Sequence, residues 1–362
     1  MKMYMNLLPC ITWKWLRMNG TEAEISPAGR SDIVLPESWG MSSDSKAYGL
    51  EVDARSNADI ERALFEDKIV TGIGPDLDRA AVENDIPVIR LTAGEDPLVI
   101  ENRYSDGDKV MTCLEITVPD GVHATVTEKF YSDEDTDAEA VFQTRFVIGA
   151  GASVDFVQVQ RLGRNVRFFN DCGSLNEKDG RLDCVSLILA GGETYYGSRA
   201  NLKGKNSAFT TDMAYIVKGD EKLDVNIAAF QRGKKTNSLI TINGALKDNA
   251  KKLVRATIDF KKGSSGSTGE ETEDVLMMND GVVNRTVPLI LCTEEDVEGI
   301  HGATLGRPSE EIVMYMMSRG LDKNTIYDIM EKARLDACAA KIADEQTRRE
   351  IQEYLHPEAS LD

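Results

Sequence analysis

The pattern of apolar and polar positions divides the chain into three regions. The first predicts mixed, mostly helical structure, because Ile60, Leu64 and Phe65 recur at helical spacing and Pro75 opens a second short helix. The middle region predicts strands, and the last predicts helices. We therefore expect three structural units, which cover residues 1–92, 93–304 and 305–362.

The middle region consists of short runs in which apolar and polar residues alternate. Leu223, Val225 and Ile227 occupy every second position, as in a strand with one buried face. Polar turns separate these runs at intervals of about 14–16 residues, and almost no helical pattern lies between them. Such an array fits a sandwich, a barrel or a solenoid of stacked coils. The short turns and the length of the array favour a β-solenoid, and a large sandwich remains open.

Helical signals dominate after residue 305. Pro308 and Ser309 stand at a helix start, and Gly320 ends that helix. A tail of about 50 residues is too small to build its own core, so we expect it to dock on the solenoid or on another protein. The apolar residues expected to contact a partner are Ile312, Tyr315, Met316, Ile326, Ile329 and Met330.

The amino-acid composition argues against some classes of binding partner. The chain has 61 acidic and 42 basic residues, a formal charge of −19, and no dense basic cluster, so we expect no nucleic acid partner. Its apolar runs are far shorter than the ~20 residues that span a bilayer. We read no secretory signal at the N-terminus and no C-x-x-C pair among the six cysteines. These features predict a soluble cytoplasmic protein with free thiols and no membrane partner.

Groups that can bind a metal are concentrated between Cys292 and His301, with four acidic residues between them. A thiolate and an imidazole suit iron or zinc, and a carboxylate can complete the shell. The alternative is that the acidic residues are solvated turn residues and that Cys292 fills the core. Motifs of phosphate-binding loops, dinucleotide-binding turns, serine hydrolases and zinc proteases are absent from the sequence.

One long segment resembles a known family. "NDGVVNRTVPLILCTEEDVEGIHGATLGRPSEEIVMYMMSRGL" is similar to the C-terminal signature of the SufB/SufD proteins, the scaffold components of the SUF iron-sulfur cluster assembly system. The preceding "GSTGEETEDVLMMND" looks like the last solenoid turns of that family, and the resemblance covers nearly the whole chain. It is closest to the short SufB/SufD-like form of anaerobic bacteria and archaea.

The resemblance implies a right-handed parallel β-helix with helical regions at both ends. It also implies that the C-terminal helices dock onto SufC, an ABC-type ATPase, and that two subunits pair through the β-helix as a homodimer or heterodimer. A cysteine desulfurase would supply sulfur, and a transient iron-sulfur cluster would form at the subunit interface, with no tightly bound cofactor. The chain itself would not be an enzyme, in agreement with the missing phosphate-binding loop.

The family's ligand set does not transfer intact. His301 matches the histidine of the family's H-[GE]-A-T motif, but Gly302, Gly299 and Glu273 stand where family members carry Glu, Cys and Cys respectively. We therefore expect a labile mixed-ligand site rather than one with only cysteine ligands. Its expected metal ligands are His301 and Cys292, and its expected carboxylates are Glu273, Glu295 and Glu298.

Two other functions remain open. The first is a structural adaptor for the ATPase that has no cluster ligands of its own, which the missing family cysteines permit. The second is a β-helix carbohydrate-active enzyme, since that fold often carries acidic catalysis in a groove. The second is disfavoured because we find no export signal and only 6% aromatic residues.

Overall fold

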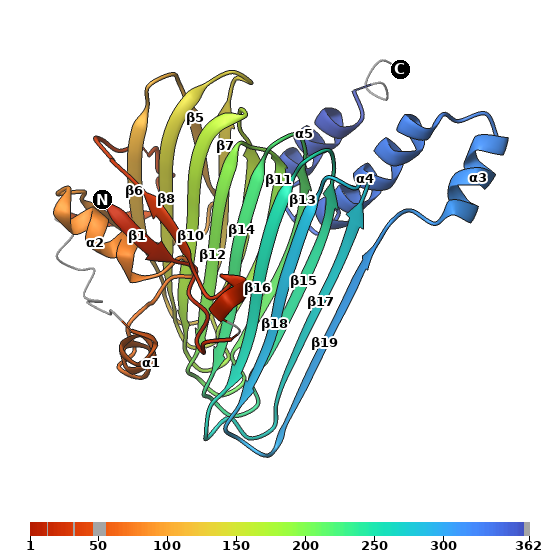
Figure 1. Cartoon of the computed structure of the whole chain (residues 1–362). Coiled ribbons are helices and arrows are strands. Elements are labelled where there is room, and N and C mark those ends of the chain that lie inside the picture. The colour runs from red at the N-terminus through yellow and green to blue at the C-terminus, as the bar shows by residue number, and fades with distance from the viewer. Residues whose placement is uncertain (13, 32, 46–55, 358–362) are drawn as a thin grey trace.

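The protein is a two-sheet parallel β-solenoid, seen in a computed structural model that describes residues 1–12, 14–31, 33–45 and 56–357 (Figure 1). In the described chain, one sheet has the strand order β18-β16-β14-β12-β10-β8-β6-β4-β3 and the other has the order β19-β17-β15-β13-β11-β9-β7-β5. Successive strands thus alternate between the sheets, and all neighbours from β4 onward are parallel. The predicted solenoid is confirmed, and the sandwich alternative is excluded.

The elements have the following bounds. The N-terminal elements are β1 (Lys2–Met5), η1 (Lys14–Leu16), β2 (Thr21–Glu24), β3 (Gly40–Ser45), α1 (Asn57–Phe65), α2 (Pro75–Glu83) and β4 (Val88–Thr92). The solenoid continues with β5 (Leu98–Tyr104), β6 (Lys109–Val118), β7 (His123–Ser132), β8 (Asp137–Ile148), β9 (Ser153–Arg161), β10 (Asn165–Asn176), β11 (Arg181–Ala190) and β12 (Glu193–Leu202). It ends with β13 (Ala208–Val217), β14 (Lys222–Gln231), β15 (Asn237–Leu246), β16 (Lys251–Phe260), β17 (Ser267–Met277), β18 (Val283–Cys292) and β19 (Val297–Gly306). The C-terminal helices are α3 (Glu310–Ser318), α4 (Lys323–Ala339) and α5 (Glu345–Leu355).

The solenoid interior follows the period-2 pattern of the sequence. Leu223, Val225 and Ile227 of β14 are buried in the main core, while Asp224 and Asn226 point to the outer face of the same sheet. Those outward residues are buried too, because further elements cover the outside of both sheets. Strands covered on both faces lose the strict apolar-polar alternation, which is why several strands read as nearly continuous apolar runs.

The N-terminal region covers the outer face of the nine-stranded sheet. Ile73 and Leu77 pack against Val141 and Phe169 of that sheet. Strands make up more of this region than the mostly helical prediction assumed, since β1 and β2 form an antiparallel pair and β3 pairs with β4. The sequence did not reveal these strand pairs, because strands this short contain too few residues for an alternating pattern to be recognised.

The segment before α2 lies directly on the sheet. Gly72 Nα donates to the Cys172 carbonyl at 3.0 Å, and Asn226 Nδ2 donates to the Gly72 carbonyl at 2.7 Å. A Cβ on Gly72 would meet Ser198 Nα at 1.9 Å, so only glycine permits this approach. The N-terminal region is therefore held on the solenoid by backbone contacts as well as by apolar packing.

The C-terminal helices cover the outer face of the other sheet. Leu335, Cys338 and Ile351 of α4 and α5 pack against Val185 and Leu187 of β11. The expectation that the tail docks on the solenoid is confirmed for these two helices. Helix α3 instead projects past the end of the sheets, as Figure 1 shows, and Val313 is its buried residue. No helix in the described ranges is long and apolar enough to cross a membrane.

Candidate functional site

The first and last coils of the solenoid differ in how far they are covered by other residues. At the first coil, Trp39 is buried in the main core and its Nε1 donates to the Asp96 carbonyl at 2.7 Å. At the last coil, β18 and β19 each stand at the edge of their sheet and pair on one side only. Most of β19 is exposed, including Ile300 at 49%. The final coil is therefore open, and it contains the residues that the sequence singled out.

A polar cluster lies inside the solenoid behind this open end. The Lys252 ammonium forms an ion pair with the Glu273 carboxylate, and both side chains are fully buried. Lys252 Nζ also donates to Asn284 Oδ1 at 2.8 Å and to Thr286 Oγ1 at 2.9 Å. We call Lys252, Glu273, Asn284 and Thr286 the interior polar cluster. The cation neutralises Glu273, so this predicted carboxylate ligand is already engaged within the chain.

His301 lies beside a different carboxylate. Its Cα partner on the neighbouring strand β17 is Glu271, so both side chains point to the inward face of the sheet. Neighbouring strands lie about 4.8 Å apart, which places the two residues side by side. Burial and the nearby Glu273 raise the pKa of Glu271 and Lys252 opposes them, which leaves this pKa at about 8. Glu271 therefore holds a proton through much of the neutral range and can deliver or accept it next to the exposed imidazole.

The sequence analysis did not select Glu271 or Lys252. Glu271 lies one coil before His301, so the coil length of about 30 residues is the signal that would have found it. No comparable signal marks Lys252, because a lysine rarely occupies an interior position. Its burial depends on Glu273, which comes from the other sheet.

Cys292 is exposed at the end of β18. Its Cα pairs with that of the inward-facing Phe260, and its Sγ donates to the Glu294 carbonyl at 2.7 Å. His301 lies five residues into β19, so about 13 Å of strand separates it from the turn that carries Cys292. The structure thus places both predicted metal ligands on the open coil but does not bring them into contact.

The acidic run after Cys292 has a largely structural role. Gly263 Nα donates to Glu294 Oε2 at 2.8 Å, and Ser265 Oγ donates to Asp296 Oδ2 at 2.7 Å, which ties this turn to the previous one. Glu295 is exposed in the same turn. The backbone donors hold the pKa of Glu294 below its usual range. Glu294 and Asp296 are turn residues, as the alternative interpretation of the acidic run expected.

Glu298 cannot act together with His301 on one ion within the chain. They are three positions apart on one strand, so their side chains point to opposite faces of the sheet. Across the described parts of the chain, no three His, Cys, Asp or Glu side chains are grouped closely enough to hold a metal ion.

The predicted docking residues fall into two groups. Ile312 and Tyr315 of α3 are at least half exposed, as are their neighbours Met314 and Met317. Ile326 of α4 is fully buried within the chain, so it is not available to contact a partner as the sequence predicted. The remaining predicted residues are intermediate or exposed: Met316, Ile329 and Met330.

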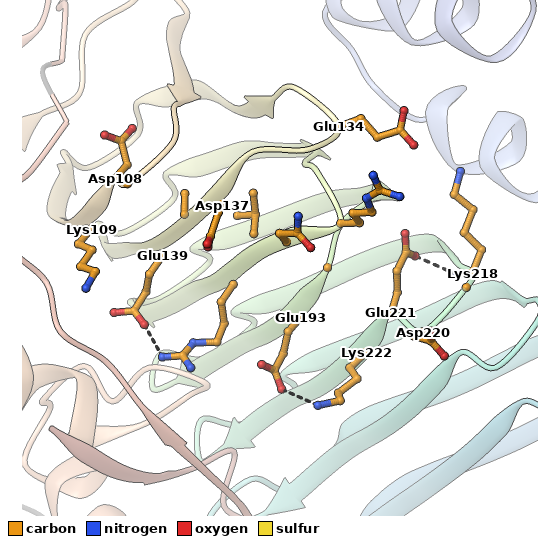
Figure 2. Close-up of a pocket in the computed structure, with 18 of the residues that line it drawn as sticks. Asp108, Lys109, Glu134, Asp137, Glu139, Glu193, Lys218, Asp220, Glu221 and Lys222 are labelled. Carbon is orange, nitrogen blue, oxygen red and sulfur yellow. Dashed lines mark hydrogen bonds and ion pairs between the residues drawn. The ribbon is translucent and has the colours of Figure 1, made fainter.

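A large groove lies away from the open end. It has a volume of about 940 Å³ and runs along the turns that precede β6, β8, β10, β12 and β14. Its charges are paired between neighbouring strands, Glu139 with Arg167 and Glu193 with Lys222, the second pair at 3.2 Å. Figure 2 shows Glu193 and Lys222 pointing toward each other in this groove. Burial raises the pKa of Glu221 in its wall to about 7. The ion pairs Glu139–Arg167 and Glu193–Lys222 therefore connect neighbouring coils of the solenoid.

Comparison with known proteins gives a consistent assignment. The family described as "SUF system FeS cluster assembly, SufBD core domain" matches residues 102–334. The iron-sulfur cluster assembly protein SufD of Bacillus subtilis is 25% identical over 211 residues, which are 58% of this chain and 48% of that protein. SufD of Escherichia coli is 22% identical over 238 residues, 65% of this chain and 56% of that protein. The chain spans about half the length of the curated relatives it matches.

Fold and site together define a parallel β-solenoid with flanking helices and an open, polar final coil. The matched core covers well over half of the residues and includes both β17 and β19. The chain belongs to the SufB/SufD family of the SUF iron-sulfur cluster assembly system.

Proposed function

We propose that the protein is a scaffold subunit of the SUF machinery, on which nascent iron-sulfur clusters are built and from which they are transferred. One observation supports this most strongly. The open coil presents an imidazole and a thiol at the edge of the solenoid, with carboxylates behind them. Imidazole, thiolate and carboxylate together suit iron, and a site without a full cysteine set would release a cluster easily.

The scaffold would work as a dimer. Ten-residue edge strands such as β18 and β19 leave a row of backbone donors and acceptors unpaired, and long exposed edges are covered in stable proteins. A second SufB/SufD subunit, identical or paralogous, would extend both sheets at this edge. It would bring further ligands to His301, Cys292 and Glu271, so that the cluster forms between the subunits as cargo.

Helix α3 would be the contact for a SufC-type ABC ATPase. It carries exposed Met, Tyr and Ile side chains, and such adaptable apolar faces suit a groove on a partner. Sulfur would come from a cysteine desulfurase. Nucleotide-driven movement of the ATPase would then open or close the dimer edge around the cluster.

The adaptor without cluster ligands is the second candidate. The Lys252–Glu273 pair favours it, because the carboxylate at the family's cysteine position is neutralised inside the chain. In that case the open coil would serve only to pair with a subunit that carries the ligands.

Anaerobic reconstitution distinguishes the two. The chain is co-expressed with its ATPase partner, supplied with iron and sulfide, and examined by absorption and Mössbauer spectroscopy. A scaffold shows cluster bands that His301→Ala and Cys292→Ala weaken, whereas the matched substitution His123→Ala, on an exposed histidine of β7, leaves them unchanged. A complex that forms normally but holds no iron would support the adaptor.

A further inference from the structure

A small cavity lies between α1 and the outer face of the nine-stranded sheet, away from the open coil. Its volume is about 150 Å³. The floor is a row across three neighbouring strands, Arg199 of β12, Ala228 of β14 and Thr257 of β16. The methyl group of Ala228 is the small member of this row and leaves the hollow between the other two.

The walls of this cavity are largely apolar. Ile60 and Leu64 of α1 form the roof together with Leu7 and Pro9, and Phe230 closes one side. The ionisable residues among its lining are two cations and two anions: Arg199, Lys261, Glu61 and Asp259. An occupant of this cavity should therefore be neutral overall, with an apolar body.

Arg199 is the unusual member of the lining. It is 5% exposed, yet its guanidinium makes none of the hydrogen bonds or ion pairs found among the described residues, and Nε is buried without a partner. Burial lowers its pKa to about 10, so the group still carries its charge at neutral pH. Buried charges are normally hydrogen-bonded as well as paired. Asp171 and Asp259 attract the guanidinium but neither is hydrogen-bonded to it, so an acceptor in direct contact is missing at this cavity.

Two other buried arginines on the same sheet face show what a satisfied site looks like. Arg145 of β8 forms an ion pair with Asp78. Arg255 of β16 donates to Asp224 Oδ1 at 2.6 Å and, through Nε, to the Met18 carbonyl at 2.6 Å. The fold therefore supplies a directly bonded carboxylate to each of these neighbours, whereas Asp171 and Asp259 attract Arg199 without a hydrogen bond to it.

The opposite side of the cavity offers unused acceptors. Asp259 Oδ2 is held by Lys261 at 3.0 Å, while Asp259 Oδ1 is buried without a partner. Thr257 Oγ1 is also buried and unpartnered. An orphaned donor group at one end and an orphaned carboxylate oxygen at the other complement a molecule with a carboxylate and an ammonium.

We propose that this cavity binds a free apolar α-amino acid of about the size of valine or leucine. Its carboxylate binds the Arg199 guanidinium, its ammonium binds Asp259 Oδ1 and Thr257 Oγ1, and its side chain lies against Ile60, Leu64 and Phe230. The site is independent of the open coil and of cluster assembly. Its occupancy would fix α1 on the sheet, because the ligand contacts both.

The test is calorimetric titration of the full chain with leucine and with its two halves, 4-methylpentanoate and 3-methylbutylamine. Leucine should bind, and each half should bind about tenfold more weakly or worse, because each lacks one of the two charged groups that bind polar atoms of the cavity. No heat and no thermal stabilisation from leucine up to its solubility limit would overturn the proposal. Equal binding of 4-methylpentanoate would overturn the assignment of an amino acid.

Variants separate binding from folding. Arg199→Met should weaken leucine binding about tenfold or more without lowering the melting temperature, since it removes an unpaired buried charge. Arg255→Met, the matched control, should lower the melting temperature because it breaks a satisfied pair. Ala228→Leu should fill the hollow and block leucine while Arg199 stays in place. Undiminished binding by a folded Arg199→Met or Ala228→Leu protein would show that leucine binds elsewhere and would refute the proposal.

Discussion

At the scale of single residues, the open end is controlled by the balance of buried charge. Lys252 and Glu273 form a pair with no exposure to water, and Lys252 has further oxygen partners in Asn284 and Thr286. Burial lowers the pKa of Lys252 and Glu273 opposes that shift. Glu271 has no such partner and retains its proton instead. Two carboxylates on one strand, two positions apart, thus have different surroundings, because Glu273 has an ion-pair partner and Glu271 has none.

The interior pair predicts a large asymmetry between single and double substitutions. Lys252→Met should lower the free energy of unfolding by about 3–5 kcal/mol, because it leaves Glu273 buried and uncompensated. Lys252→Met combined with Glu273→Leu should recover most of that loss. Urea denaturation measures both, with the exposed neighbour Lys251→Met as the control. A double variant as unstable as the single one would contradict the pairing.

Glu271 predicts a pH dependence of stability. Its pKa in the folded state is raised to about 8 from 4.5, so the folded state binds this proton more tightly than the unfolded state. Its contribution is present in acid and is lost as the pH rises from about 5 to 8. Glu271→Gln should remove this loss, which makes the variant more stable than wild type by roughly 2–4 kcal/mol above pH 8.

Other buried carboxylates titrate in the same range, so this prediction concerns a difference between proteins. Burial also raises the pKa values of Glu128 and Asp171 to about 7. Denaturation curves at several pH values should therefore be compared between wild type, Glu271→Gln and the exposed control Glu270→Gln. Parallel pH profiles for wild type and Glu271→Gln would disprove the assigned shift.

At the scale of elements, the three C-terminal helices have separate roles. Helices α4 and α5 are part of the solenoid's packing, since Leu335, Cys338 and Ile351 lie in a core shared with β11. Helix α3 has Val313 as its buried residue and leaves Met314 and Met317 exposed at 70% and 50%. Deleting the whole tail would therefore uncover core surface, and surface substitutions on α3 test docking more cleanly.

The docking role of α3 predicts loss of binding without loss of stability. Met314→Glu together with Met317→Glu should weaken binding of the ABC-type ATPase about tenfold or more, because charges replace apolar contact residues. Both side chains are exposed, so the melting temperature should change little. Val99→Glu, an exposed apolar position on β5, is the control. Co-purification and surface plasmon resonance measure the effect, and unchanged affinity would refute the assignment.

At the scale of the whole molecule, the asymmetry between the two ends of the solenoid is the main feature. Trp39 and the β3 strand close the first coil, while the last coil has unpaired edges in both sheets. The N-terminal region and α4–α5 cover the outer faces in between. In the described chain, the last coil therefore presents an exposed edge strand in each sheet, and the proposed second subunit would pair there.

That asymmetry predicts association through β19. Ile300 is half exposed on the outward face of this edge strand, and a lysine there should disfavour strand pairing. Ile300→Lys should shift the co-expressed protein from dimer to monomer in sedimentation equilibrium. Val82→Lys, at an exposed position of α2, should not. Identical sedimentation of wild type and Ile300→Lys would exclude this edge as the interface.

The sequence by itself determined the array of strands that favours a β-solenoid, the helix that begins at Pro75, the helix that ends before Gly320, and the family motif around His301, because these depend on residues close together in the chain. Only the tertiary structure excluded a sandwich and decided that Lys252 neutralises Glu273, that Ile326 is buried and that Arg199 lacks a hydrogen-bond partner. These contacts join residues a coil or more apart. Which residues lie side by side depends on the length and conformation of every turn between their strands. The local periodicity of the sequence does not specify these turns.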